Sequence, residues 1–392
     1  MSAASTPARP RLLAALYYLT YFAAGGAIYP YFNVYYQSVG MTNQEIGVLA
    51  ALPTVMSLFA SPFWSGLADR LGLHHILLPG LLLATTVPAL LLTGAQSFAA
   101  LAALVLLYMF LLSPVIPLAE NAIVTMLNRD RNVYGSVRLW GAVGFGIASL
   151  ATGYAATTWG FRVNFFIYSA LALVAVLVAS RLPAVTTLPT EAYFTRLRQL
   201  AANVHWRSFM IAVLLVGVGY AIYDNFSAIY LRDLGAAPDL LGLAFLLSTV
   251  SEVPIFFYSP VLMRRLTLRG MILMALLAFA VRGLAWSLVT TPEWGLAVQL
   301  LHGVSFSALW TAGVLYVSQI APPGLGASAQ SLFTVALMGL GRAVGALLGA
   351  SLYDGLGAPQ AFRWAGLIAL AGAGVFILTQ RRADRQVGAE QA

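Results

Sequence analysis

Long apolar stretches separated by short polar segments run along the whole chain of 392 residues. A bilayer core about 30 Å thick needs about 20 apolar residues in a helix, and the hydropathy pattern predicts twelve such stretches. We therefore expect an all-α integral membrane protein with twelve transmembrane helices. The predicted spans are residues 12–36, 46–66, 76–94, 98–127, 136–158, 162–181, 208–232, 239–262, 270–290, 294–319, 327–353 and 359–380.

Composition supports a membrane protein and excludes two kinds of site. Hydrophobic residues make up 60% of the chain and charged residues 9%, which no soluble globular domain matches. There is no cysteine, so a disulfide framework or a thiolate metal site is impossible. The first apolar stretch is too long, and too weakly basic in front, for a cleaved signal peptide, so we expect it to remain as the first span.

The basic residues predict the orientation in the membrane, because basic residues near the ends of spans are retained in the cytoplasm. All 21 basic residues are arginines. With the amino terminus inside, outer loops hold Arg162, Arg232 and Arg363, and the spans hold Arg138, Arg282 and Arg342. We expect both termini to be cytoplasmic in a cell (inner) membrane, and the net charge of +8 then gives no reason to expect nucleic acid binding. The fifteen arginines on the cytoplasmic side would be Arg9, Arg11, Arg70, Arg129, Arg131, Arg181, Arg196, Arg198, Arg207, Arg264, Arg265, Arg269, Arg381, Arg382 and Arg385.

The chain also contains an internal repeat. It predicts a six-helix bundle over 1–181, a cytoplasmic linker over 182–207 and a second, pseudo-symmetric six-helix bundle over 208–392. Duplicated halves with a cavity at the membrane midplane are an architecture of transporters. The alternative is a chance similarity between two apolar helices. The repeated positions lie 195 residues apart and are Tyr35 and Tyr230, Gly40 and Gly235, and Gly47 and Gly242, and each half later carries a Ser-Pro pair.

The segment SGLADRLGLHH follows the second predicted span as a loop. It resembles the signature loop of the major facilitator superfamily, which has the form GxxxDRxG. The resemblance implies a cytoplasmic gate made by Gly66, Asp69 and Arg70. His74 and His75 stand where the family has basic residues. The alternative is that the acid and the arginine form only a solvated loop pair.

Two charged residues lie inside neighbouring spans. Glu120 occurs in LLSPVIPLAENAIVTML, and Arg138 follows it in the next span. An unpaired ionised side chain at the bilayer centre costs about 2.5–3.5 kcal/mol, and antiparallel helices could cancel much of this cost by pairing the two. The pair is either a substrate-binding element or a purely structural ion pair.

This region resembles that of the lactose permease family, the proton-coupled sugar and nucleoside symporters. In that family a glutamate and an arginine at the same interval bind the sugar, and a glycine matches Gly135. The resemblance implies that Glu120 and Arg138 contact substrate, with Asn121 beside them. Phe145 stands at the place of the sugar-stacking tryptophan, so an aromatic face is kept while galactoside specificity does not follow.

The second half resembles the same family in its coupling residues. Arg282 and His302 match an arginine and a histidine twenty residues apart on consecutive helices. The family's proton-carrying glutamate is here Ser305, and its lysine is Gln299. The alternative for His302 is a hydrogen-bonding residue without a role in coupling.

The proton site must therefore have moved if protons are used. Our first candidate is Glu252, which lies about one turn past the family's acidic position, now Thr249. Asp224 is the second candidate and Glu120 the third. Arg342 could neutralise Asp224, since their helices both border the cavity in this family.

The chain also resembles the phenylpropionate permease group in LHGVSFSALW and AQSLFTVALMGLGRAVGALLG. In the second phrase Gly341, Gly345 and Gly349 recur at four-residue intervals, which suits close helix packing.

Two aromatic stripes favour an organic substrate over a bare ion. They could stack on sugars, nucleobases or phenyl rings. The alternatives are core packing and, for Tyr17 and Tyr36, the tyrosine belt at the membrane interface. The first stripe comprises Tyr17, Tyr21, Gly25, Tyr29 and Asn33, and the second comprises Gln299, His302, Phe306 and Trp310.

Together these features predict a secondary active transporter. We expect proton-coupled uptake of a small polar or aromatic organic solute, such as a sugar, a nucleoside or an aromatic acid, by a monomer without a cofactor. One alternative is a proton-driven exporter of amphiphilic compounds. Another is a non-transporting receptor or sensor on the same fold, which would carry long soluble extensions. Neither an enzyme nor an ATP-driven pump is expected, because the chain has no clustered histidine and acid motif and no P-loop.

Overall fold

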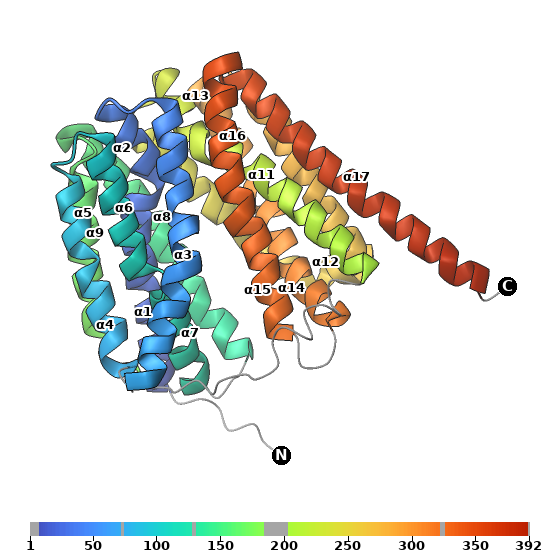
Figure 1. Cartoon of the computed structure of the whole chain (residues 1–392), viewed down its shortest axis with the longest axis horizontal. Coiled ribbons are helices and arrows are strands. Elements are labelled where there is room, and N and C mark those ends of the chain that lie inside the picture. Colours follow the sequence, from blue (N-terminus) through green and yellow to red (C-terminus); the bar gives the residue numbers. More distant parts are fainter. Residues whose placement is uncertain (1–7, 72–73, 128–130, 184–202, 322–325, 391–392) are drawn as a thin grey trace. The chain divides into compact units, whose positions relative to one another are not determined.

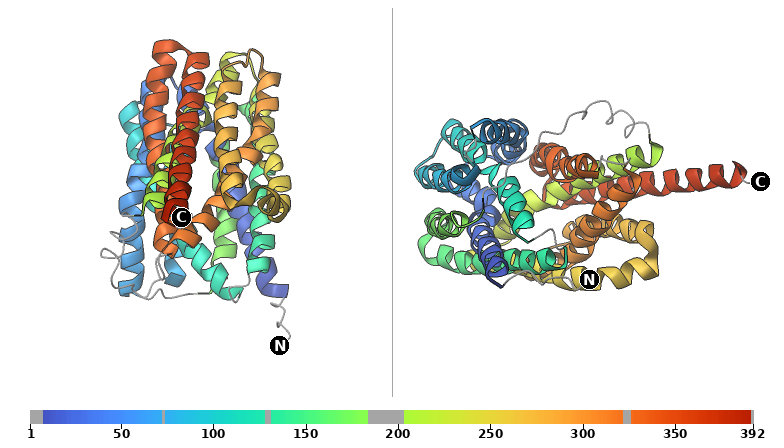
Figure 2. Two further views of the ribbon diagram at one scale, coloured as in Figure 1. Left: turned by 90° about the vertical axis from the view of Figure 1, so that its right-hand side faces the viewer. Right: turned by 90° about the horizontal axis from the view of Figure 1, so that it is seen from below.

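The computed structural model describes residues 8–390, apart from 72–73, 128–130, 184–202 and 322–325. Within these residues every regular element is a helix, as Figures 1 and 2 show. The chain divides into two compact units, which we describe separately. Unit 1 comprises 1–45, 52–188 and 236–249, and unit 2 comprises 46–51, 189–235 and 250–392.

The helices of the first half are broken where proline or a short turn interrupts the backbone ladder. Pro30 lies in the 3-10 turn between α1 and α2, and Pro114 lies between α6 and α7. Proline lacks the N–H that the ladder needs, so each of these spans consists of two helical pieces. The elements are α1 (Ala8–Ile28), η1 (Tyr29–Tyr31), α2 (Phe32–Ser38), α3 (Asn43–Leu71), α4 (His74–Ala84), α5 (Thr86–Leu92), α6 (Phe98–Leu112), α7 (Val115–Met126), α8 (Arg131–Trp159) and α9 (Val163–Ala179).

The second half has longer helices and two π-helical segments, η2 and η3. The backbone of α12 leaves the helical region at Thr267, where φ is 63° and ψ is 167°, so α12 is two helices joined at a sharp turn. The elements are α11 (Val204–Asp233), α12 (Pro238–Trp286), α13 (Pro292–Gln299), η2 (Gly303–Ser307), α14 (Ala308–Ile320), α15 (Gly326–Thr334), η3 (Val335–Leu340), α16 (Gly341–Leu356) and α17 (Ala358–Glu390).

The helices confirm the predicted twelve spans. In the described part of the chain, nine helices are long and apolar enough to cross a membrane, and two shorter apolar helices cover 76–92 and 163–179. One of the nine long helices, α12, contributes two spans, so the long helices supply ten spans and the two shorter helices complete the twelve.

One predicted boundary was wrong. The segment with Gly66, Asp69 and Arg70 was expected in a loop, but its backbone continues α3 to Leu71, because no proline stops the helix there. The side chains of these three residues lie outside what the structure describes. The last predicted span, 359–380, agrees with the apolar part of α17, 358–379. Figure 1 shows this helix continuing past it to Glu390, because its polar end is rich in helix-forming arginine, alanine and glutamine.

Most of the predicted linker, 184–202, lies outside the described residues. The boundaries of the two bundles and of this linker stay a prediction.

The internal repeat is visible in the geometry of each half. Gly40 and Gly235 both end a helix with a positive φ, 90° and 95°, a conformation that glycine adopts at no steric cost. Tyr35 donates to the carbonyl of Leu92 at 2.6 Å, and Tyr230 donates to that of Val289 at 2.7 Å. The predicted duplication is therefore confirmed, since equivalent residues make equivalent contacts.

Small residues bring α16 against α11, which lie side by side in unit 2 (Figure 1). A Cβ placed on Gly345 would collide with the carbonyl of Val218, and one on Gly349 would lie 3.0 Å from the ring of Phe226. Gly341 faces Gly217 in the same way. The predicted close packing of the three glycines is confirmed.

Candidate functional site

Glu120 on α7 and Arg138 on α8 are brought together in unit 1, but loosely. The Nε of Arg138 lies 3.9 Å from Oε1 of Glu120, which is too far for a hydrogen bond. The guanidinium instead lies over the ring of Phe22, at 4.2 Å from its centroid, and 5.3 Å from that of Tyr18. A cation–π contact is worth about 0.5–2 kcal/mol and a half-exposed ion pair about 0–1 kcal/mol, so the rings contribute at least as much as the carboxylate.

Sequence reasoning missed Tyr18 and Phe22. Tyr18 and Phe22 each follow one residue after Tyr17 and Tyr21 and have the same four-residue spacing. The sequence therefore indicates a second aromatic stripe on the first span, beside the predicted one. It was not used because only one stripe of that helix was considered.

The predicted stripe on α1 forms in part. The rings of Tyr17 and Tyr21 stack at 5.7 Å with an interplanar angle of 17°. The ring of Tyr29 folds back over Gly25, to within 2.9 Å of a Cβ placed there. The interface-belt alternative for Tyr17 and Tyr36 was wrong, because both side chains are buried among other residues of the protein. The remaining predicted residues of unit 1, Asn33, Asn121 and Phe145, are half-buried.

Three of the predicted coupling residues of unit 2, Glu252, His302 and Arg282, form one continuous hydrogen-bonded chain with Gln299. Nε2 of His302 lies 3.1 Å from Oε1 of Glu252, and Nδ1 of His302 lies 2.8 Å from Nη1 of Arg282. The Nη2 of Arg282 donates to Oε1 of Gln299 at 2.5 Å. Arg282 and Gln299 are each only 3% exposed, so this end of the chain is buried.

The hydrogen-bond partners of His302 assign its tautomer. A guanidinium can only donate, so Nδ1 of His302 must accept from Arg282 and carries no proton. The proton is then on Nε2, which donates to Glu252. His302 is therefore neutral in this arrangement, between a carboxylate and a guanidinium.

A close contact between Gly303 and Ser251 positions the hydrogen-bonded chain. The N–H of Gly303 donates to Oγ of Ser251 at 2.9 Å, and a Cβ at Gly303 would collide with the carbonyl of Ser251. Glu252 follows Ser251 in the sequence, and His302 precedes Gly303. This close approach therefore brings Glu252 and His302 within hydrogen-bonding distance. Sequence reasoning missed Ser251 and Gly303, because a glycine after a histidine gives no local sign of which helix it approaches.

Ser305 does not replace the glutamate of the resembling family. Its hydroxyl is buried and donates to the backbone carbonyls of Leu301 and His302 on its own helix, each at 3.0 Å. In this arrangement it serves the local π-helical backbone of η2.

The second aromatic stripe forms a stacked column beside the chain. His302 and Phe306 stack at 5.2 Å and 12°, and Phe306 and Trp310 stack at 5.9 Å and 21°. Two tyrosines of α11 lie beside the column. The Cζ of Arg282 lies 5.1 Å from the centroid of the Tyr223 ring, and the ring centroids of Tyr220 and Phe306 are 6.2 Å apart.

The contact that we expected between Asp224 and Arg342 is present in unit 2. Nη2 of Arg342 lies 2.7 Å from Oδ2 of Asp224, and the guanidinium lies over Tyr220 at 5.6 Å. The two side chains are 19% and 30% exposed, so they partly neutralise each other away from water.

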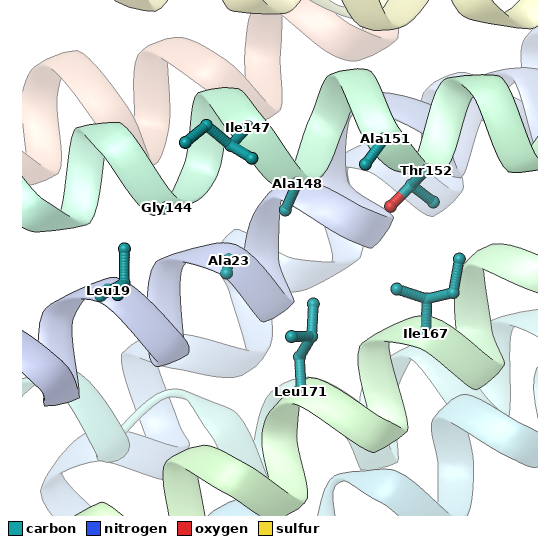
Figure 3. Close-up of a pocket in the computed structure, with 9 residues that line it drawn as sticks. All are labelled: Leu19, Ala23, Gly144, Ile147, Ala148, Ala151, Thr152, Ile167 and Leu171. Carbon is teal, nitrogen blue, oxygen red and sulfur yellow. The ribbon is translucent and has the colours of Figure 1, made fainter.

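A separate apolar pocket of about 340 Å³ lies between α1, α8 and α9. Figure 3 shows that its lining is apolar apart from Thr152 and includes none of the predicted site residues. Within the described residues no group of three or more histidine and acidic side chains could hold a metal ion.

The model of the MFS_1 like family matches residues 12–364. The chain belongs to the MFS_1 like family. It is thus a major facilitator transporter of the permease type and a multi-pass membrane protein, and the families and proteins that it resembles are transporters rather than enzymes.

Two relatives are similar to this MFS_1-like chain in sequence, and one solved structure is similar to it in fold. It is 26% identical over 380 residues to a maltose permease of Geobacillus stearothermophilus, covering 96% of each chain. It is 29% identical over 361 residues to a probable 3-phenylpropionic acid transporter of Escherichia coli strain K12, covering 88% of this chain and 91% of the relative. A solved mutant of the nucleoside transporter NupG has the same fold, with a TM-score of 0.83, 16% identity and coverage of 94% and 99%.

Proposed function

We propose that this MFS_1-like transporter takes up a small polar or aromatic organic solute by proton symport and alternating access. The observation that carries the proposal is the chain from Glu252 through His302 to Arg282, which places a carboxylate inside a membrane span with a neutral imidazole as its hydrogen-bond donor. A membrane-embedded carboxylate with such a partner suits a group that takes up and releases one proton in each cycle. The names of the relatives refer to maltose, 3-phenylpropionic acid and nucleosides, which agree with a sugar, an aromatic acid or a nucleoside here.

In this proposal the two halves of the chain have different tasks. Glu120 and Arg138 bind the solute beside the rings of α1, and Glu252 carries the proton with Arg282 and His302 as partners. Most further contacts would come from Tyr29, Asn33, Asn121, Phe145, Gln299, Phe306 and Trp310, with Asp224 and Arg342 as an auxiliary pair and Gly66, Asp69 and Arg70 as the cytoplasmic gate. The protein would act as a monomer in the inner membrane.

Uptake into proteoliposomes that contain a pH-sensitive dye tests the proposal. The solute is first found by thermal-shift screening of sugars, nucleosides and aromatic acids. With an inward solute gradient, a symporter acidifies the vesicle interior in either orientation. Alkalinisation would instead support the proton-driven exporter, and a solute that binds without moving would support the receptor.

Glu252→Gln separates coupling from binding. The amide imitates the protonated acid, so the variant should exchange solute down its gradient while losing accumulation driven by a proton gradient. Asp233→Asn is the matched control, since it neutralises an acid that bonds Tyr353 near the end of the same unit's α11. If the glutamine variant still accumulates solute, Glu252 is not the carrier, and Asp224 becomes the residue to test.

A further inference from the structure

We propose that Arg282 binds the carboxylate of an aromatic acid when Glu252 is protonated, so that one proton and one organic anion cross the membrane together without net charge. This inference rests on the proposed proton symport and narrows its substrate class. It follows from how the charges of unit 2 are compensated.

Arg282 differs from the other two arginines in the predicted spans. Arg138 and Arg342 each have a carboxylate oxygen within 4 Å, at 3.9 and 2.7 Å. In the part of the chain that the structure describes, Arg282 has no carboxylate at such a distance, and neutral His302 separates it from Glu252. The hydrogen-bonded side chains of Glu252, His302 and Arg282 together carry no net charge, with the negative charge on Glu252 and the positive charge on Arg282.

Protonation of Glu252 changes this balance. The hydrogen bond to His302 can persist, because the carbonyl oxygen of the acid still accepts from Nε2. The site then holds the guanidinium alone, and a buried charge without a counter-ion costs several kcal/mol. An arriving carboxylate removes that cost, whereas a neutral sugar does not. Binding of the proton and binding of the anion therefore favour each other by the same factor.

Among the groups that surround the hydrogen-bonded chain, Glu252 is the one whose protonation changes the net charge of the site. From α11, Tyr220 and Tyr223 are neutral phenols, and Asp224 is paired with Arg342 of α16. Gln299 at the end of α13 has no charge, and both ring nitrogens of His302, which lies between α13 and η2, already have partners in Arg282 and Glu252.

The same site offers contacts for both parts of an aromatic acid. A guanidinium binds a carboxylate through a fork of parallel N–H groups, and the buried Nε of Arg282 has no hydrogen-bond partner within the described residues. The half-buried rings of Phe306 and Trp310 stack in the column that begins at His302. His302 joins the guanidinium of Arg282 to this column, and an aryl ring joined to a carboxylate by a short linker matches that arrangement.

Binding of 3-phenylpropionate to the purified protein tests the inference, with the neutral amide 3-phenylpropanamide as the matched ligand. The wild type should bind the acid about 10-fold more tightly at about pH 5.5 than at about pH 8, because a lower pH favours the protonated form of Glu252 to which the anion binds. Glu252→Gln should bind it with the low-pH affinity at both values. The amide should bind weakly and without pH dependence.

Four variants keep the result interpretable. Asp233→Asn should behave as the wild type. His302→Gln should keep the pH dependence, because an amide can accept from Arg282 and donate to Glu252. Arg282→Gln should lose the preference for the acid over the amide, and Arg282→Lys, which retains a charge, should restore part of it if the glutamine variant folds poorly.

Equal affinity of the wild type for acid and amide, or a pH dependence that survives Glu252→Gln, would overturn the inference. Transport measurements distinguish failure of this inference from failure of the proposed symport. Proton-coupled uptake of the acid should be insensitive to an imposed membrane potential. If a neutral solute is taken up with protons and responds to that potential, symport stands and the anion site is refuted, whereas both fall if no solute moves protons.

Discussion

The three arginines in the membrane spans are accommodated by three different kinds of partner. Arg138 lies on aromatic rings, Arg342 pairs directly with an acid, and Arg282 is bonded to a neutral imidazole and an amide. An isolated charge in hydrocarbon is costly, and each partner lowers that cost by a different amount. Arg282, whose two hydrogen-bond partners carry no charge, has the least direct compensation of the three.

Asp224→Asn tests the direct pair. The substitution leaves Arg342 partly buried without its counter-ion, and we expect a loss of about 1–3 kcal/mol in the free energy of unfolding, less than for a fully buried pair because both side chains are partly exposed. Unfolding in detergent by heat and by SDS measures it. The double variant Asp224→Asn, Arg342→Gln should recover part of the loss. A double variant that is less stable than the single one would contradict a compensating pair.

Thr267 has a backbone conformation that favours glycine. Its φ of 63° with ψ of 167° costs a residue with a side chain about 1–3 kcal/mol. Thr267→Gly should therefore be more stable than Thr267→Ala by about 1 kcal/mol, the reverse of the usual order in helices, where alanine is favoured. Both variants lose the acceptor that Thr267 offers to the N–H of Gly270, so their difference in melting temperature isolates the backbone. Greater stability of the alanine variant would show that this turn relaxes.

At the scale of elements, two π-helical segments lie next to predicted coupling residues of unit 2. η2 begins directly after His302, and η3 ends just before Gly341 and Arg342. A π-helical turn inserts one extra residue and redirects the side chains that flank it, and such turns are frequent at functional sites. In η2 it coincides with the contact between Gly303 and Ser251 that sets the distance from His302 to Glu252.

Gly303→Ala tests the role of that contact. The added methyl group collides with the carbonyl of Ser251, so α12 and η2 must separate, and overpacking of this kind costs about 1–3 kcal/mol. We expect a lower melting temperature and weakened proton-driven accumulation, with downhill exchange retained. Gly374→Ala on α17 is the control, because a Cβ there meets nothing within 4 Å. If both variants behave alike, the close approach at Gly303 has no part in coupling.

At the scale of the whole molecule, the duplication repeats local geometry in both halves. The helix-ending glycines Gly40 and Gly235 and the hydrogen bonds of Tyr35 and Tyr230 recur at equivalent places. The charged residues do not recur, since the first half carries a loose pair and the second half carries a chain and a pair. The shared parts thus maintain the fold, and the differing parts are where we place solute binding and coupling.

The distribution of arginines predicts that both termini lie in the cytoplasm. Tags at either end should therefore be inaccessible to a membrane-impermeant reagent in intact cells and accessible after permeabilisation. A cysteine introduced beside Arg162 or Arg363 should react in intact cells, and the absence of native cysteine makes the labelling unambiguous. Labelling of one terminus alone would require an odd number of spans and would contradict the twelve-span topology.

The sequence by itself determined the features that depend on local composition. Apolar length gave the twelve spans, the interval of 195 residues gave the duplication, and the four-residue spacing of Gly341, Gly345 and Gly349 gave a close helix contact. The contact between Asp224 and Arg342 was expected only through the resemblance to a family in which both helices border the cavity, and unlike charges in hydrocarbon have few other partners.

Only the tertiary structure decided which atoms meet. The placement of Arg138 over Phe22, the neutral state of His302 and the collision that confines residue 303 to glycine all depend on how one helix is rotated and shifted against another. Hydropathy does not encode that rotation, since every side of a membrane helix can be apolar. Packing selects it through many small contacts between residues that are distant in the sequence.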